Sequence, residues 1–159
     1  MRVGIGYDAH PLVEGRPLVL GGVAIPHTQG LAGHSDSDVL AHAVVDALLG
    51  AASLGDIGHL FPPEDPRYKD ANSILFIEET ERLLKAHRWR VTNVDATIIA
   101  QEPRLAPYLP KMRDALSRAL GVSADQVNVK GKSTNGLGYE GRGEGIAAHA
   151  VVLIESVPS

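Results

Sequence analysis

The sequence predicts a single α/β (α+β) domain, a two-layer sandwich with helices on one face of a mixed β-sheet. Stretches with the pattern of strands are interspersed with stretches whose apolar residues recur at helical spacing. The 159 residues, 44% of them hydrophobic, suffice for one core, and no linker or repeat divides them. We therefore expect residues 1–159 to form one domain. The uncovered sheet face predicts an oligomer, because a single chain rarely leaves such a surface in water.

The chain is expected to begin with a strand and a hairpin. Residues 1–8 alternate apolar and small side chains, which is typical of a strand. Apolar triplets at 18–20 and 23–25 flank Gly21 and Gly22, and this pattern predicts a tight turn between two short strands.

The next expected elements are a flexible approach, a helix and a loop. Residues 30–33 contain two glycines and read as the flexible approach. Helical spacing of apolar residues then predicts a helix over 36–53, with Ser35 and Ser37 as candidate caps. Residues 56–66 are too rich in Pro and Gly to predict regular structure.

The second half is expected to alternate helices with strands. Two prolines fix a turn after the most apolar strand, and a Gly-rich loop precedes the last strand. The expected elements are helices over 71–86 and 108–120 and strands over 89–101, 127–130 and 146–155.

Composition excludes several classes of protein. The chain has no Cys, so any zinc site must use His, Asp and Glu, which favours a catalytic over a structural metal. The net charge is -4 and basic residues are scattered, so no nucleic-acid surface is expected. No apolar run is long enough to span a membrane, and the first residues lack a signal or transit pattern. These features predict a cytoplasmic protein that binds neither nucleic acid nor membrane.

Three ionisable residues form a candidate metal site. Asp8 and His10 are two apart on an expected strand and so project from one side of it, whereas His42 lies on the expected helix. Asp38 and Asp46, one helical turn before and after His42, are candidates to orient its imidazole. Two histidines and one carboxylate make a zinc site with an open fourth position. The spacing alone also fits ordinary polar residues on a strand and a helix.

Five motifs occur along the chain in a fixed order. They are GIGYDAH at 4–10, HSDSDV at 34–39 followed by His42 and Asp46, GDIG at 55–58, FP at 61–62 and GRGEG at 141–145. Together they resemble the 2-C-methyl-D-erythritol 2,4-cyclodiphosphate synthase family over essentially the whole chain. The resemblance implies a homotrimer whose sheets pack around its axis, with active sites between adjacent subunits, in the non-mevalonate isoprenoid pathway.

The resemblance implies a cyclisation that releases CMP. The 2-phosphate of 4-diphosphocytidyl-2-C-methyl-D-erythritol 2-phosphate would attack the β-phosphate and form the 2,4-cyclodiphosphate. By matched position, Asp8, His10 and His42 hold one Zn²⁺ per subunit. His34 and Ser133 are matched to groups that stabilise the transition state. A second divalent cation, Mg²⁺ or Mn²⁺, is implied as a bridge between phosphates.

The resemblance also implies a set of substrate contacts. Ser35 is matched to the reacting phosphates, residues 56–58 to the methylerythritol hydroxyls and 61–65 to a mobile segment. Residues 100–106 of the adjacent subunit are matched to the cytidine, and 131–135 to the nucleotide phosphates. The full set is Ser35, Asp56, Ile57, Gly58, Phe61, Pro62, Pro63, Glu64, Asp65, Ala100, Gln101, Glu102, Pro103, Arg104, Leu105, Ala106, Lys132, Thr134, Asn135, Tyr139 and Arg142.

One segment departs from the family pattern. The family usually has Lys-Ala-Thr-Thr-x-Glu where this chain has Lys-Gly-Lys-Ser-Thr-Asn at 130–135. Ser133 keeps the expected hydroxyl, whereas Asn135 replaces a metal-binding glutamate with a neutral, weaker ligand. We therefore expect looser Mg²⁺ binding, with Lys132 offsetting phosphate charge.

Tyr139 and Arg142 are matched to a cavity on the threefold axis. Tyr139 stands where the family usually has Phe, and Arg142 matches the usual arginine. In related proteins this cavity accepts an isoprenoid diphosphate. The alternative role for Arg142 is an ion pair with Glu144 across the trimer.

Two other functions share some of these features. A zinc phosphoesterase would use the same three ligands but hydrolyse its substrate with metal-bound water. A non-catalytic trimer that binds isoprenoid diphosphates would use Arg142 and the Gly-rich loop. It would have no use for residues 56–58 or for the cytidine segment.

Overall fold

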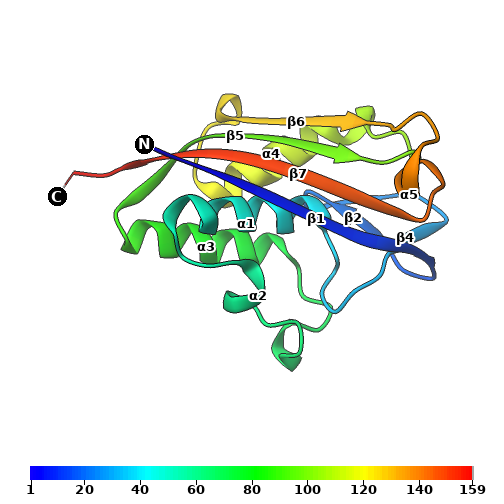
Figure 1. Cartoon of the computed structure of the whole chain (residues 1–159), viewed down its shortest axis with the longest axis horizontal. Helices are drawn as coiled ribbons and strands as arrows, with labels where there is room; N and C mark the ends of the chain where they lie inside the picture. The colour runs from blue at the N-terminus through cyan, green and yellow to red at the C-terminus, as the bar shows by residue number, and fades with distance from the viewer. Residues whose placement is uncertain (159) are drawn as a thin grey trace.

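The structure, a computed structural model, describes residues 1–158 and consists of two layers (Figure 1). One layer is a five-stranded sheet in the order β4-β1-β7-β5-β6, in which only β5 and β6 run parallel. Helices cover one face, which confirms the expected mixed-sheet α/β fold. Its strands are β1 (Arg2–Glu14), β4 (Gln29–Leu31), β5 (Trp89–Ile99), β6 (Val127–Lys132) and β7 (Gly145–Ser156), and β2 (Leu18–Leu20) and β3 (Val23–Ile25) form the expected hairpin outside this sheet.

The helical layer contains three long helices. Helix α1 packs on β1 and β7, α4 packs on β6, and α3 contacts both α1 and α4. Within residues 1–158, none of the helices has both the length and the apolar character that crossing a membrane requires. The helices are α1 (Val39–Ala52), α3 (Ile74–Ala86) and α4 (Leu109–Leu120), with short helices α2 (Ile57–Leu60) and α5 (Gly138–Gly141) and 3-10 turns η1 (Pro66–Tyr68), η2 (Ala106–Tyr108) and η3 (Ala124–Gln126).

The first strand is longer than the sequence predicts. It runs to Glu14 because Leu12 to Glu14 pair with Gln29–Leu31, which form β4 rather than the expected flexible approach. Asp8 and His10 therefore lie within the strand and not at its end.

Helix α1 begins at Val39, three residues later than expected. Neither Ser35 nor Ser37 caps it, and Ser37 has a φ of 59°, which is left-handed and cannot continue a helix. The cap is Asp38, whose carboxylate accepts the amide of Ala41 at 3.0 Å. A carboxylate at this position is favoured because it satisfies free amides at the positive end of the helix.

The two loops expected to be irregular each contain a helical turn. In residues 56–66, Asp56 accepts the His59 amide at 2.8 Å and caps α2. Asp65 caps η1 with Pro66 as its first residue. The Gly-rich segment 131–145 contains α5. In residues 56–66, side-chain caps thus stabilise helical turns despite the high Gly and Pro content.

Glycines bring α1 onto β1. A Cβ atom at Gly4 would lie 2.0 Å from the Ala47 carbonyl oxygen, and one at Gly6 would lie 1.8 Å from that of Ala43. Any larger side chain would push the helix away from the strand. Because side chains alternate along a strand, Asp8 lies on the same face as the glycines and is directed toward α1.

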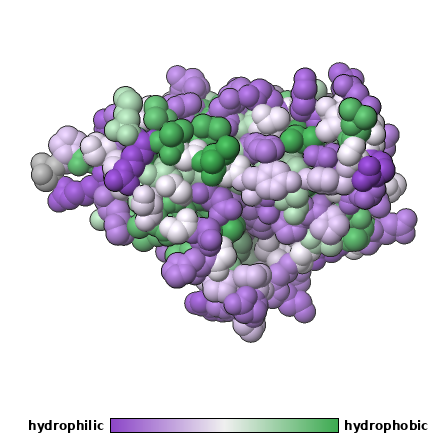
Figure 2. Space-filling view, in the orientation of Figure 1, coloured by the Kyte–Doolittle hydropathy of each residue, from purple (hydrophilic) through white to green (hydrophobic). Residues whose placement is uncertain are grey.

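The opposite face of β1 is apolar and open. Val3, Ile5 and Tyr7 are exposed there beside Val151 of β7, and Ile5 is 71% exposed. Figure 2 shows apolar side chains gathered over this part of the sheet. A contiguous exposed patch of this kind marks an interaction surface.

We expect the purified protein to self-associate through this face. Ile5→Asp should convert the oligomer to monomers, because a charge buried in an apolar interface costs about 3 kcal/mol or more per copy. Sedimentation velocity measures the change. Leu75→Asp is the matched control, since Leu75 is 56% exposed on α3 in the other layer and should leave the oligomer intact. A monomeric parent protein at micromolar concentration would contradict this expectation.

Candidate functional site

Asp8 and His10 of β1 meet His42 of α1 at one point. The Asp8 Oδ2 atom lies 3.0 Å from His10 Nε2 and 3.0 Å from His42 Nδ1, and one ligand atom from each residue lies within 4.8 Å of the others. Zinc ligands lie about 2.0–2.2 Å from the ion, so atoms of one tetrahedral site are a little over 3 Å apart. The three residues therefore fit a divalent metal site.

The hydrogen bonds of His10 direct its second nitrogen to this point. Nδ1 donates to the Ala32 carbonyl at 2.9 Å, which leaves Nε2 facing Asp8. Burial lowers the pKa of His10, but the hydrogen bond and charge of Asp8 outweigh it, and the pKa is raised. For Asp8, burial raises the pKa, yet the bonds from His10 and His42 lower it overall. The negative charge of Asp8 and a positive charge on His10 thus stabilise each other.

The two carboxylates expected to orient His42 have other partners. Asp38 is buried and accepts the amides of Gly21 and Gly22 at 2.9 and 2.8 Å in addition to its helix cap. Burial raises the pKa of Asp38 to about 6. Asp46 accepts the Ile57 amide at 2.7 Å. Neither carboxylate hydrogen-bonds to the imidazole of His42, so the expectation that they orient it is wrong.

Instead, His42 Nε2 contacts two serines. Ser73 Oγ lies at 2.8 Å and Ser35 Oγ at 3.2 Å. Ser73 in turn donates to Asp36 at 2.5 Å. Sequence reasoning missed Ser73 and Asp36 because they are 37 residues apart and only the packed fold brings them together.

The metal-site residues line a cavity of about 190 Å³. Two aromatic residues that sequence reasoning missed, Tyr68 and Phe76, form its wall, and Phe61 stacks on Phe76 with ring centroids 4.4 Å apart. In the sequence, Phe76 is only one apolar residue of a helix face. The sequence-predicted residues in this lining are Asp8, His10, His34, Ser35, His42, Ile57, Gly58, Phe61 and Pro63.

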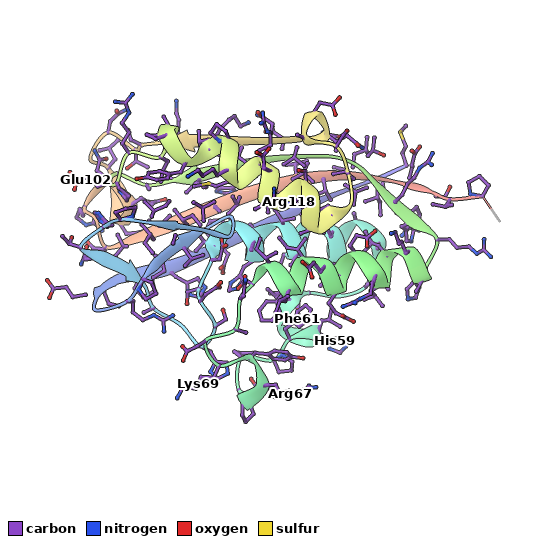
Figure 3. The ribbon with its side chains drawn as sticks, turned by 180° about the vertical axis from the view of Figure 1, so that it is seen from behind. His59, Phe61, Arg67, Lys69, Glu102 and Arg118 are labelled. Carbon is purple, nitrogen blue, oxygen red and sulfur yellow. The ribbon has the colours of Figure 1, made fainter. Side chains whose placement is uncertain are left out.

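The remaining predicted residues of this region lie around the cavity. His34 Nε2 is 2.8 Å from the Asp65 carbonyl oxygen, so the segment after α2 holds this histidine. The Asp65 carboxylate pairs with Arg67 and caps η1, and Asp56 caps α2. Pro62 and Glu64 lie in the same segment, outside the lining. Figure 3 shows this segment, from Phe61 to Arg67, projecting below the helical layer.

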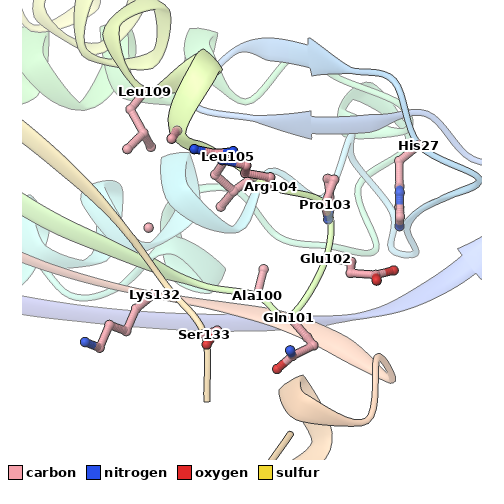
Figure 4. A pocket seen from close by; sticks show the side chains of 12 residues that line it. His27, Ala100, Gln101, Glu102, Pro103, Arg104, Leu105, Leu109, Lys132 and Ser133 are labelled. Carbon is pink, nitrogen blue, oxygen red and sulfur yellow. The ribbon is translucent and has the colours of Figure 1, made fainter. Parts of the chain in front are cut away.

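A second cavity of about 590 Å³ lies at the end of β5. It gathers all seven residues predicted to contact cytidine, 100–106, with Lys132 and Ser133 at the end of β6 (Figure 4). Gly131, from the segment 131–135 matched to the nucleotide phosphates, also lines it, as do His27 and Leu109, which were missed. Nothing in the sequence around His27 indicated a binding role, since it is a single histidine that follows Pro26.

The two cavities share no lining residue within one chain. His34 lines the first and Ser133 the second, so the two residues matched to transition-state stabilisers lie apart. A single subunit therefore presents two separate partial sites.

The four predicted residues between positions 134 and 142 also lie outside both linings. Thr134 Oγ1 donates to the Leu137 carbonyl at 2.5 Å, and Asn135 contacts Ser133. The Tyr139 hydroxyl lies 2.7 Å from that of Tyr7. Arg142 pairs with Glu144 within the same chain, where the alternative interpretation expected a pair across subunits.

The cluster predicts how the pKa of His10 responds to removal of Asp8. Asp8→Asn removes the negative charge and leaves burial as the main influence, so the pKa of His10 should fall below its parent value. NMR titration of the imidazole carbons in metal-stripped protein measures this. Exposed His87 is an internal control whose imidazole signals should be the same in both proteins. An unchanged pKa of His10 would show that Asp8 does not act on it.

Known proteins are similar to this chain in sequence and in fold. Residues 1–155 match the YgbB family. A 2-C-methyl-D-erythritol 2,4-cyclodiphosphate synthase of Moorella thermoacetica is 63% identical over 97% of this chain and 94% of its own length. A solved 2C-methyl-D-erythritol-2,4-cyclodiphosphate synthase, in a form bound to CDP, is 39% identical with a TM-score of 0.89, over 97% of this chain and 100% of that one. The IspF–CDP complex of Plasmodium falciparum is 33% identical with a TM-score of 0.86, over 99% and 97%. Because the match extends over nearly the full length in sequence and in structure, the chain belongs to the YgbB family.

Proposed function

We propose that this protein converts 4-diphosphocytidyl-2-C-methyl-D-erythritol 2-phosphate to 2-C-methyl-D-erythritol 2,4-cyclodiphosphate and CMP. It is thus a cyclising lyase of the non-mevalonate isoprenoid pathway. The observation that carries the proposal is the convergence of Asp8, His10 and His42 beside His34, in a chain 63% identical to a synthase of this name.

The metal in this proposal is one Zn²⁺ per subunit, held by Asp8, His10 and His42. Two neutral imidazoles and one carboxylate suit zinc and leave one position free for substrate. When bound, the ion supplies Lewis-acid polarisation of a phosphate oxygen.

The reaction needs alignment more than it needs a base. A 2-phosphate oxygen forms a bond to the β-phosphorus, the bond from that phosphorus to the bridging oxygen breaks, and CMP leaves with the electron pair. A phosphate is already nucleophilic at neutral pH, so the main task is to hold two anionic groups together. His34 Nε2 donates to the Asp65 carbonyl oxygen, and this bond fixes the orientation of the imidazole beside the reacting phosphates.

Charge on the nucleotide side is offset by residues of the larger cavity. Lys132 supplies a cation and Ser133 a hydroxyl donor, and both line the cavity beside the cytidine segment 100–106. A second divalent cation, Mg²⁺ or Mn²⁺, neutralises further phosphate charge when bound. The match of the fold to structures in complex with CDP supports a cytidine nucleotide as the ligand.

We further propose a homotrimer with each active site between adjacent subunits. The exposed apolar face of β1 and the separation of His34 from Ser133 support it, because assembly would cover the face and can join two partial sites. Tyr139 and Arg142 are proposed to face the central cavity and to bind an isoprenoid diphosphate there. A cytoplasmic location is also proposed, since a charged nucleotide substrate does not cross a membrane unaided.

A ³¹P NMR assay tests the reaction directly. With substrate, Zn²⁺ and Mg²⁺, the parent protein should produce CMP and a cyclic diphosphate. His42→Ala should lower the rate by at least about a hundredfold, because it removes a metal ligand. His87→Ala, at the exposed end of α3, is the control and should keep the parent rate.

The other outcomes of this assay identify the alternatives. An acyclic phosphorylated product would indicate a phosphoesterase in place of a cyclase. Substrate that survives intact with both metals present would overturn the enzymatic proposal and favour a binding protein.

Asn135 predicts weaker binding of the second metal than a glutamate would give. It has a φ of 56°, a left-handed conformation that Asn tolerates far better than Glu does. Asn135→Asp adds a charged ligand, and Asp also tolerates this backbone conformation. It should therefore lower the Mg²⁺ concentration for half-maximal activity by roughly tenfold. Asn135→Glu should do the same and also lower the melting temperature. An unchanged Mg²⁺ requirement in both variants would contradict a role for Asn135 in binding the cation.

A further inference from the structure

The Ser73 hydroxyl is used in an unusual way. Ser73 is the N-cap residue of α3 and is fully buried, yet its side chain makes no capping hydrogen bond. N-cap serines normally accept an amide of the first helical turn. Here the hydroxyl lies 2.5 Å from Asp36 Oδ1 and 2.8 Å from His42 Nε2. It is therefore committed to these two side chains.

The donor and acceptor roles in this chain follow from Asp36. Its carboxylate also accepts the amide of Ser73 at 3.0 Å and the amide of Asp38 at 3.1 Å. With three donors directed at it, the carboxylate is the acceptor, so the Ser73 hydroxyl hydrogen points to Asp36. The Ser73 oxygen is then left to accept a hydrogen bond from His42 Nε2–H.

This direction decides which nitrogen of His42 carries the lone pair. Asp8 lies 3.0 Å from Nδ1 and, as an acceptor, favours the imidazole proton on Nδ1. A metal ligated by Nδ1 needs that nitrogen without its proton. Asp36 acts from the opposite side through Ser73 and favours the proton on Nε2. Ser35 Oγ, at 3.2 Å, is the longer of the two serine contacts and lines the cavity. Ser73 is thus the principal partner of Nε2–H.

We propose that Asp36 and Ser73 are positioning residues that hold His42 with Nε2 protonated and Nδ1 directed at the metal. The inference rests on the proposed metal site and adds to it the hydrogen-bond chain that sets its affinity. Partners of this kind behind a metal-bound histidine typically change metal affinity by about 10–100-fold.

Zinc affinity in competition with a chromophoric chelator is the first test. Ser73→Ala should bind Zn²⁺ about 10–100-fold more weakly than the parent, and Ser73→Thr, which keeps the hydroxyl, should recover most of the loss. Ser117→Ala is the matched control, because Ser117 is also a buried serine but bonds the Asp114 carbonyl on α4. It should bind Zn²⁺ as the parent does.

NMR of the zinc-loaded protein is the second test, and it is read only for variants whose signal dispersion matches the parent, which excludes a loss of folding. The parent should show a His42 Nε2–H proton protected from exchange with water, and Ser73→Ala should exchange it at least about tenfold faster. Parent protein with an unprotected Nε2–H, or Ser73→Ala with zinc affinity within twofold of the parent, would overturn the inference alone. A parent protein that binds no zinc would overturn the metal site and this inference together.

Discussion

The direct contact between the backbone of α1 and the glycines of β1 determines most of the site. Gly4 and Gly6 leave no room for a Cβ atom, so the helix lies on the strand itself. The same strand face continues to Asp8 and His10. There the first turn of α1 supplies His42 at 3.0 Å from Asp8. The metal cluster therefore follows from close packing of a strand and a helix, which is more rigid than a site built on loops.

The acidic loop before α1 adds a second level of constraint. Asp38 joins the start of the helix to the β2–β3 turn through the amides of Gly21 and Gly22, and burial raises its pKa to about 6. Asp36 joins the loop to the start of α3. These two carboxylates hold the segment that carries His34, so the loop is fixed at both sides of the cavity. Asp38, which the sequence suggested as a partner of His42, instead positions backbone amides.

Periodic patterns explain what could be predicted from the sequence. Alternation along a strand predicts that Asp8 and His10 share a face, and helical spacing places His42 on α1. These patterns made the three residues a candidate metal site before their contact was known. Other features depend on contacts between distant segments. Strand β4 has three residues and exists because Leu31 pairs with Leu12. The link from Ser73 to Asp36 likewise has no local pattern, since its geometry arises only when α3 docks against the loop.

The two cavities place a size constraint on any substrate of this reaction. The metal-site cavity measures about 190 Å³, below the range of about 300–1,000 Å³ that is typical of ligand pockets. It is therefore too small for a cytidine with two phosphates and a sugar alcohol. The larger cavity of about 590 Å³ suits the nucleotide but none of Asp8, His10 and His42 lines it. A substrate with cytidine at one end and the reacting phosphates at the other therefore needs both cavities. Within one chain they share no lining residue, which supports the proposal that adjacent subunits complete the site as well as cover the apolar face of β1.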